Sequence, residues 1–249
     1  MQTKIITSLR YYFLFFYFSF SFAQQWHHLG LTGEKIERIA IDKTNLNVIY
    51  AGSVSDFSLS KVGKLFKTTN GGISWDTLIN DISVRDIDFH PTNSNIVFAL
   101  GGWNGLTQQK VLKTTDAGKT WVRADSGISL LGTSSPSALE FDIMRPETVY
   151  AATSSSLDVG GLYRSTNNGL SWEKVVGPVD LLAGVTVIGI DPQNTDNLFV
   201  GTNFNAELFK SIDGGKTWVK KGSNGRIINV IRFSGNQRIY LVPAEKVGY

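Results

Sequence analysis

Aromatic and amide side chains occur together in short segments that interrupt the regular pattern of this chain. Trp103 is followed by Asn104, and Phe57 and Phe204 lie in similar segments rich in Ser, Asn and Asp. An aromatic ring offers a flat apolar face that can stack on a sugar ring, while a neighbouring amide bonds its hydroxyls. These four residues are therefore candidates for a ligand-binding surface. The alternative is that the rings pack over neighbouring loops.

The composition argues against metal and thiol chemistry. The chain contains no cysteine and three histidines, which gives little material for a zinc site or a reactive thiol. His27 and His28 are adjacent, so in a strand they would point to opposite faces and could not share a metal. His90 stands in a predicted turn, where we expect a structural role. We therefore expect no metal and no other cofactor.

The strands and turns around these residues are predicted by an eight-residue pattern, [ST]-x-[DN]-x-G-x-[ST]-W. We call this pattern the box. It occurs four times, at 68–75, 114–121, 165–172 and 211–218. Its tryptophans are 46, 51 and 46 residues apart. A fixed period in this range is typical of a repeat architecture.

Each position of the box has a physical reason. The Asp or Asn can accept backbone N–H groups within a tight turn, and the glycine suits a backbone site with positive φ. The Ser and Thr hydroxyls can join the two arms of the turn, and the tryptophan begins the next strand. We expect a structural role, without chemistry, for the following box residues: Asn70, Gly72, Trp75, Asp116, Gly118, Trp121, Asn167, Gly169, Trp172, Asp213, Gly215 and Trp218.

Short alternating runs surround every box and predict four strands per unit. The first strand of each unit is expected at 36–41, 84–89, 138–143, 185–190 and 228–233. Alternation with period two marks a half-buried strand, and four-stranded antiparallel units of about 46 residues match the blade of a β-propeller. We therefore predict an all-β fold, a β-propeller of about four complete blades plus a partial fifth.

The blade boundaries leave two interpretations of the ring. We expect blades near 31–80, 81–126, 135–177 and 182–222, a partial blade at 226–249, and an extra outer strand at 25–30. In one interpretation, five blades close with the N-terminal strand completing the last one. In the other, which we favour, the chain is the front part of a larger propeller, because the fifth unit reaches Tyr249 before its box.

Residues 1–23 have the pattern of a secretory signal peptide, with 24–249 as the propeller domain. Lys4 and Arg10 precede an aromatic and apolar run, which ends in the small-x-small cleavage site Ser21-Phe22-Ala23. This predicts a secreted, periplasmic or cell-surface protein that meets the membrane only during export. Removing the two basic residues lowers the formal charge from +3 to +1, so the basic pI does not indicate nucleic-acid binding.

The box and the strands before it resemble the Asp-box, or BNR, repeats of sortilin-type propellers and of xyloglucan-hydrolysing propellers of glycoside hydrolase family 74. The segment Asp158–Arg164, D-V-G-G-L-Y-R, also resembles a stretch of that hydrolase family that lies close to a catalytic Asp. The resemblance implies Asp158 as a catalytic candidate. Glycoside hydrolysis needs a second carboxylate about 5–10 Å away, and Asp56 in another loop is a possible partner.

The resemblance supports three hypotheses of function. The first is a binding or scaffold module for a polysaccharide or a protein, with ligands on the variable loops opposite the boxes. The second is a glycoside hydrolase, xyloglucanase-like, or an N-terminal fragment of one. The third is an assembly factor like the propellers that help to build photosystem II. The sequence leaves the ligand, the catalytic activity and the oligomeric state open.

Overall fold

The computed structural model describes most of the chain beyond its N-terminal segment. The described residues are 30–56, 61–102, 109–130, 134–155, 160–177, 184–203, 206–223, 225–234 and 238–243. They contain strands and turns and no helix. Within this part of the chain, therefore, no helical segment is long and apolar enough to cross a membrane.

Five antiparallel sheets follow one another along the chain, four of them with four strands and the last with two. The first holds β1 (Ile36–Ile41), β2 (Ile49–Ser53), β3 (Leu65–Thr68) and β4 (Asp76–Ile79); the second β5 (Ser83–Phe89), β6 (Val97–Gly102), β7 (Lys110–Thr114) and β8 (Val122–Arg123); the third β9 (Ser135–Phe141), β10 (Val149–Ser154), β11 (Gly161–Ser165) and β12 (Glu173–Lys174); the fourth β13 (Val185–Ile190), β14 (Leu198–Thr202), β15 (Leu208–Ser211) and β16 (Val219–Lys220); the fifth β17 (Ile228–Phe233) and β18 (Ile239–Pro243). The all-β prediction is confirmed. The total number of blades and the closure of the ring stay predictions.

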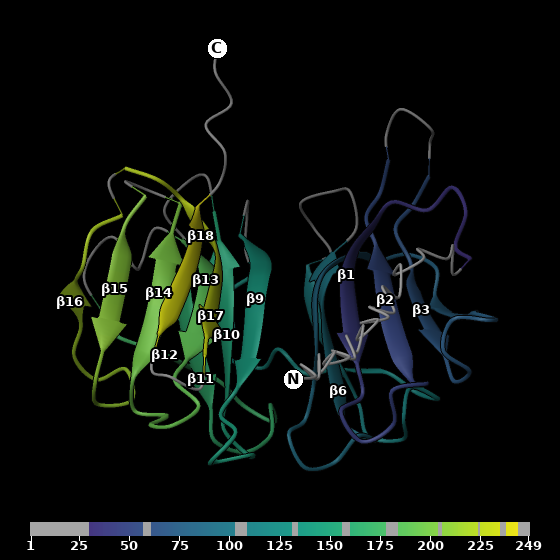
Figure 1. The fold of residues 1–249 in the computed structure, drawn as a ribbon, viewed down its shortest axis with the longest axis horizontal. Helices are drawn as coiled ribbons and strands as arrows, with labels where there is room; N and C mark the ends of the chain where they lie inside the picture. The colour runs from purple at the N-terminus through teal and green to yellow at the C-terminus, as the bar shows by residue number, and fades with distance from the viewer. Residues whose placement is uncertain are drawn as a thin grey trace, which may run out of the picture.

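The sheets stand side by side, each turned relative to the one before (Figure 1). Their first strands contact one another in the order β1, β5, β9, β13 and β17. Within the described residues, β17 and β1 form no contact of comparable extent. The described sheets thus form an arc around their first strands.

One aromatic contact recurs between successive sheets and builds the core. Tyr50 on β2 meets Phe89 at the end of β5, with ring centroids 5.4 Å apart, and the rings stand edge to face. An equivalent edge-to-face contact joins Phe98 to Phe141 at 5.5 Å, and Phe199 packs against Phe233 with tilted rings and centroids 5.8 Å apart. Such aromatic pairs add to the free energy gained by burying the rings. The core therefore lies between the sheets and not within any one of them.

Glycine at the end of the second strand lets successive sheets approach closely. A Cβ on Gly52 would lie 2.4 Å from Cγ1 of Val84 in the next sheet. A Cβ on Gly201 would lie 3.2 Å from Cβ of Ile228 in the next sheet. A side chain at Gly52 would force its sheet and the next apart, and one at Gly201 would crowd the later junction.

Candidate functional site

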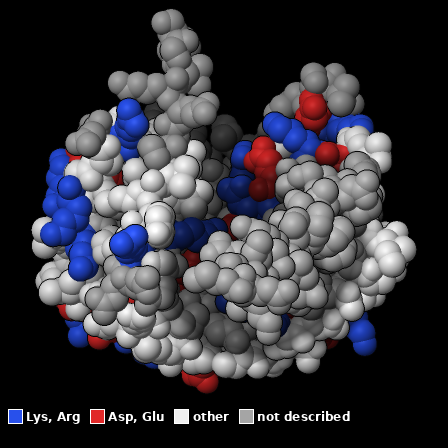
Figure 2. All heavy atoms as spheres, viewed as in Figure 1, with Lys and Arg blue, Asp and Glu red and all other residues white. Residues whose placement is uncertain are grey.

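A cavity of about 900 Å³ lies where the first strands of all five sheets meet. Figure 2 shows acidic and basic side chains gathered around a hollow near the centre of one face. The charged residues that line the cavity are Glu37, Arg38, Asp42, Lys43, Asp86, Asp88, Glu140 and Arg232. A concave site with a few converging polar groups is the usual form of a ligand pocket.

The alternation of β5 and β9 explains why carboxylates enter this cavity. On β5, Asp86 and Asp88 flank Ile87, which packs in the core against the first sheet. On β9, Glu140 stands between the buried residues Leu139 and Phe141. Side chains of a strand alternate between its two faces. The apolar positions therefore fill the core, and the acidic positions border the cavity.

Two of these carboxylates hold the second and third sheets together. β9 is an edge strand of its sheet, so some of its N–H groups have no partner on a neighbouring strand. Leu139 donates its N–H to Oδ2 of Asp86 over 2.9 Å, and Phe141 donates its N–H to Asp88. Because an unpaired buried N–H is costly, both aspartates stabilise the junction of β5 and β9.

Glu140 lies between Leu139 and Phe141 in the chain, and its carboxylate has different surroundings. Its carboxylate receives no side-chain or backbone hydrogen bond among the described residues. Burial, followed by the charges of Asp88 and Asp86, raises the pKa of Glu140 to about 8. Burial and the charge of Asp86 raise the pKa of Asp88 to about 7. Close carboxylates disfavour ionising together, so protons are held in this cluster near neutral pH.

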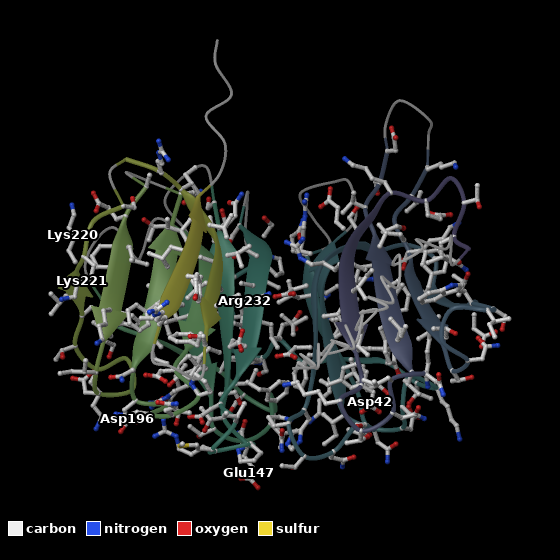
Figure 3. All side chains as sticks on the ribbon, in the orientation of Figure 1. Asp42, Glu147, Asp196, Lys220, Lys221 and Arg232 are labelled. Atoms are coloured by element: carbon white, nitrogen blue, oxygen red, sulfur yellow. The ribbon has the colours of Figure 1, made fainter. Side chains whose placement is uncertain are left out.

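Two arginines enter the cavity from the two ends of the arc. Arg38 comes from β1, and its Nε lies 3.9 Å from Oδ1 of Asp86. Arg232 comes from β17, as Figure 3 shows, and donates one N–H to the carbonyl of Ile231 over 2.9 Å. Each guanidinium carries five N–H donors. The cavity thus offers fixed donors beside carboxylate acceptors, which suits a ligand rich in hydroxyl groups.

The structure tests few of the loop residues suggested by the sequence. Trp103, Asn104, Phe57, Phe204 and Asp158 lie outside the described residues. Asp56 is described, and its backbone exchanges hydrogen bonds of 2.9 Å with that of Lys61. Asp56 is not part of the lining of the central cavity, so the cavity brings other carboxylates together. These acids lie on strands and not on the loops that the sequence favoured. The alternation R-D-I-D-F at 85–89 was the pattern that could have indicated them.

The four box turns share one hydrogen-bonding pattern. In the first, Thr68 donates its hydroxyl to Asn70 over 2.8 Å and accepts the N–H of Gly72 over 3.0 Å. Oδ1 of Asn70 accepts the N–H of Ser74 over 3.0 Å. The same three bonds recur in the other boxes, and the glycines Gly72, Gly118, Gly169 and Gly215 all have positive φ.

Hydrogen bonds also fix the charge of the box aspartates. The hydroxyl and N–H of Thr120 hold the pKa of Asp116 at about 2, and Thr217 does the same for Asp213. Between sheets, Lys67 donates to the carbonyl of Ala117 over 2.7 Å. Since these polar groups satisfy one another, the box turns offer little to a ligand.

The turns between first and second strands are joined in the same way at the end of the molecule where Figure 3 labels Asp42, Glu147 and Asp196. Ser94 donates its hydroxyl to Asp42 over 2.7 Å. Arg145 bridges Asp142 and Asp196 with distances of 2.6 and 2.8 Å. The polar groups of this end are thus used between sheets, and the central cavity remains the stronger candidate site.

Comparison with solved structures identifies the fold of this chain. No family model matches the chain. The GH74 enzyme of Niastella koreensis is similar in structure, with a TM-score of 0.64 and 21% identity over 85% of this chain and 33% of the enzyme. YCF48 from Cyanidioschyzon merolae has a TM-score of 0.57 and 16% identity over 84% of this chain and 63% of its own. The fold is that of a β-propeller. The four-stranded sheets are its blades.

The sequence has a curated relative of the same kind. A probable oligoxyloglucan-reducing end-specific xyloglucanase of Neosartorya fischeri is 24% identical over 147 residues, which span 56% of this chain and 18% of the relative. The chain therefore covers about a fifth of this relative and a third of the bacterial enzyme. The similarity to these two proteins is therefore a similarity to part of a xyloglucanase propeller.

Proposed function

We propose that this chain is a secreted Asp-box propeller that binds a glycan in its central cavity and on the adjoining loops. The cavity carries the proposal. Its volume of about 900 Å³ lies within the range of small-molecule sites, 300–1,000 Å³. Carboxylates and arginines can bond hydroxyl groups there, and the rings of Phe89 and Phe233 also line the space. The xyloglucanases to which the chain is similar favour a β-glucan as the ligand class.

Binding fits the described carboxylates better than catalysis does. Asp86 and Asp88 each accept a backbone N–H from β9, which gives them a structural role. Glu140 accepts no hydrogen bond from the described residues, and the positive charges of Arg232 and Lys43 act on its carboxylate. A ligand hydroxyl that bonds Glu140 and Arg232 would replace the water that these groups otherwise bind.

Calorimetric titration with xyloglucan oligosaccharides tests this proposal. We expect Glu140→Ala to weaken binding by roughly two- to tenfold, since one net hydrogen bond is worth about 0.5–1.5 kcal/mol. Glu147→Ala is the matched control, because Glu147 is an exposed acid that does not line the cavity. Equal affinities for the two variants and the unaltered protein would exclude the cavity as the binding site.

A glycoside hydrolase is the second candidate, favoured by the raised pKa values of Asp88 and Glu140. A protonated carboxyl beside an ionised one is the arrangement that glycosidases use for acid and base roles. If this candidate is right, the chain releases reducing ends from xyloglucan, and Glu140→Gln or Asp158→Ala removes most of that release. A chain that binds the polymer without any release rejects hydrolysis and leaves the binding proposal in place.

A further inference from the structure

One side chain holds the turn between the first and second strands in each four-stranded blade. In three blades it is an aspartate: Asp42, Asp142 and Asp191 accept the N–H of the residue two positions later over 2.8, 3.0 and 3.0 Å. In the second blade it is a histidine, since Nδ1 of His90 accepts the N–H of Thr92 over 3.3 Å. The four positions are equivalent, because each residue also donates its own N–H to the carbonyl six residues later.

The bond from Thr92 determines the protonation state of the His90 ring. A ring nitrogen that accepts a hydrogen bond carries no proton, so the proton of the neutral ring is on Nε2. An imidazolium has protons on both nitrogens and accepts from neither. Protonated His90 would therefore set a second donor against the N–H of Thr92. A carboxylate at this position keeps its acceptor oxygens down to about pH 4, so the turn of the second blade differs from the other three in mild acid.

The His90 ring also belongs to the junction between the second and third blades. His90 is only 8% exposed, and its ring meets the ring of Phe141 on β9 edge to face, with centroids 5.4 Å apart. Phe141 packs in turn against Phe98 of the second blade. A change in the position of the imidazole would therefore be felt by the aromatic core of this junction.

The surroundings of His90 oppose its protonation. Burial lowers the pKa of His90, and the positive charge of Lys113 on β7 lowers it further, whereas Glu147 in the turn after β9 acts in the other direction. β9 itself presents the uncharged ring of Phe141. Because the folded state takes up this proton less readily than the unfolded chain, the stability that the neutral ring supports is present above about pH 6.5 and is lost as the pH falls below it.

We propose that the turn at His90 is an acid-sensitive latch between the second and third blades. Protonation of His90 removes the acceptor of the Thr92 N–H and loosens the contact with Phe141. Asp86 and Asp88 bind β9 across the same junction, so the latch acts on one wall of the central cavity. Histidine is suited to such a role because its charge changes in the range of pH 5–8.

Hydrogen exchange of single backbone amides, corrected for the intrinsic rate at each pH, tests the latch. Between about pH 7.5 and pH 5 we expect the protection of the Thr92 amide to fall by roughly two- to tenfold, as for the loss of one hydrogen bond. The Met144 amide, which donates to Asp142, is the internal control and should keep its protection. His90→Asp, which places the carboxylate of the other turns here, should keep the protection of Thr92 at both pH values. His90→Asn supplies a neutral acceptor and serves if the first variant does not fold.

The amides of the turn decide the outcome, because Asp88 and Glu140 give the overall stability a pH dependence of the opposite sign. An equal change in protection at Thr92 and Met144 overturns the proposal. A fall at Thr92 that persists in the His90 variants also overturns it, since acid would then act through another group. A His90 imidazole that titrates above about pH 6.5 by NMR would show that the fold does not oppose its protonation, and it would overturn the latch as well.

Discussion

At the level of single residues, the carboxylates that line the cavity differ in their roles. Asp86 and Asp88 complete the hydrogen bonding of an edge strand, while Glu140 has no such bond. The sequence alternation of β5 could have predicted that acids reach the interior. It could not predict which acid stays unengaged, because that depends on the register between two blades.

The pH dependence of stability follows from the same residues. The pKa of Asp88 is raised to about 7 and that of Glu140 to about 8, so between about pH 4 and 8 the folded state binds more protons than the unfolded state. The free energy of unfolding should therefore fall as the pH rises through this window.

Denaturant unfolding at intervals from pH 4.5 to 8.5 measures this slope. Glu140→Gln, which cannot ionise, should flatten it, whereas Glu147→Gln should leave it unchanged. A stability that rises from pH 5 to 8 in the unaltered protein would contradict the assignment of raised pKa values to the cavity. The box aspartates act at lower pH, since their lowered pKa values of about 2 remove stability only below about pH 4.

At the scale of the element, the box turn is a locally determined structure. Its side chains bond its own backbone, and its glycine takes a positive φ, so the pattern of eight residues contains nearly all that the turn needs. The strands were predictable for the same reason, since period-two alternation is local. The charged lining of the cavity forms only where blades pack together, so local sequence patterns did not predict it.

Loss of one box hydroxyl should destabilise a whole blade junction. Thr114 is buried and accepts the N–H of Gly118 over 2.9 Å. Thr114→Ala leaves that N–H unpaired beside Tyr50 of the preceding blade, so we expect a loss of about 1–3 kcal/mol in the free energy of unfolding. Thr115→Ala, at the exposed next position, should change it by less than about 0.5 kcal/mol. Equal losses would show that the box hydroxyl has no special role.

For the molecule as a whole, blades packed face to face enclose a charged cavity. The repeat period predicted the blades, because each repeat is one supersecondary unit. The cavity could not be predicted that way, since it arises from how successive sheets are oriented. The loops that carry Trp103 and Asp158 remain candidates on sequence grounds.

If a glycan occupies the cavity formed by the first strands of the blades, a crystal of the protein soaked with a xyloglucan oligosaccharide should show it there. We expect sugar density within hydrogen-bonding distance of the carboxylate of Glu140 and the guanidinium of Arg232. Sugar density confined to the box turns or the outer strands, with the cavity filled by water, would contradict it.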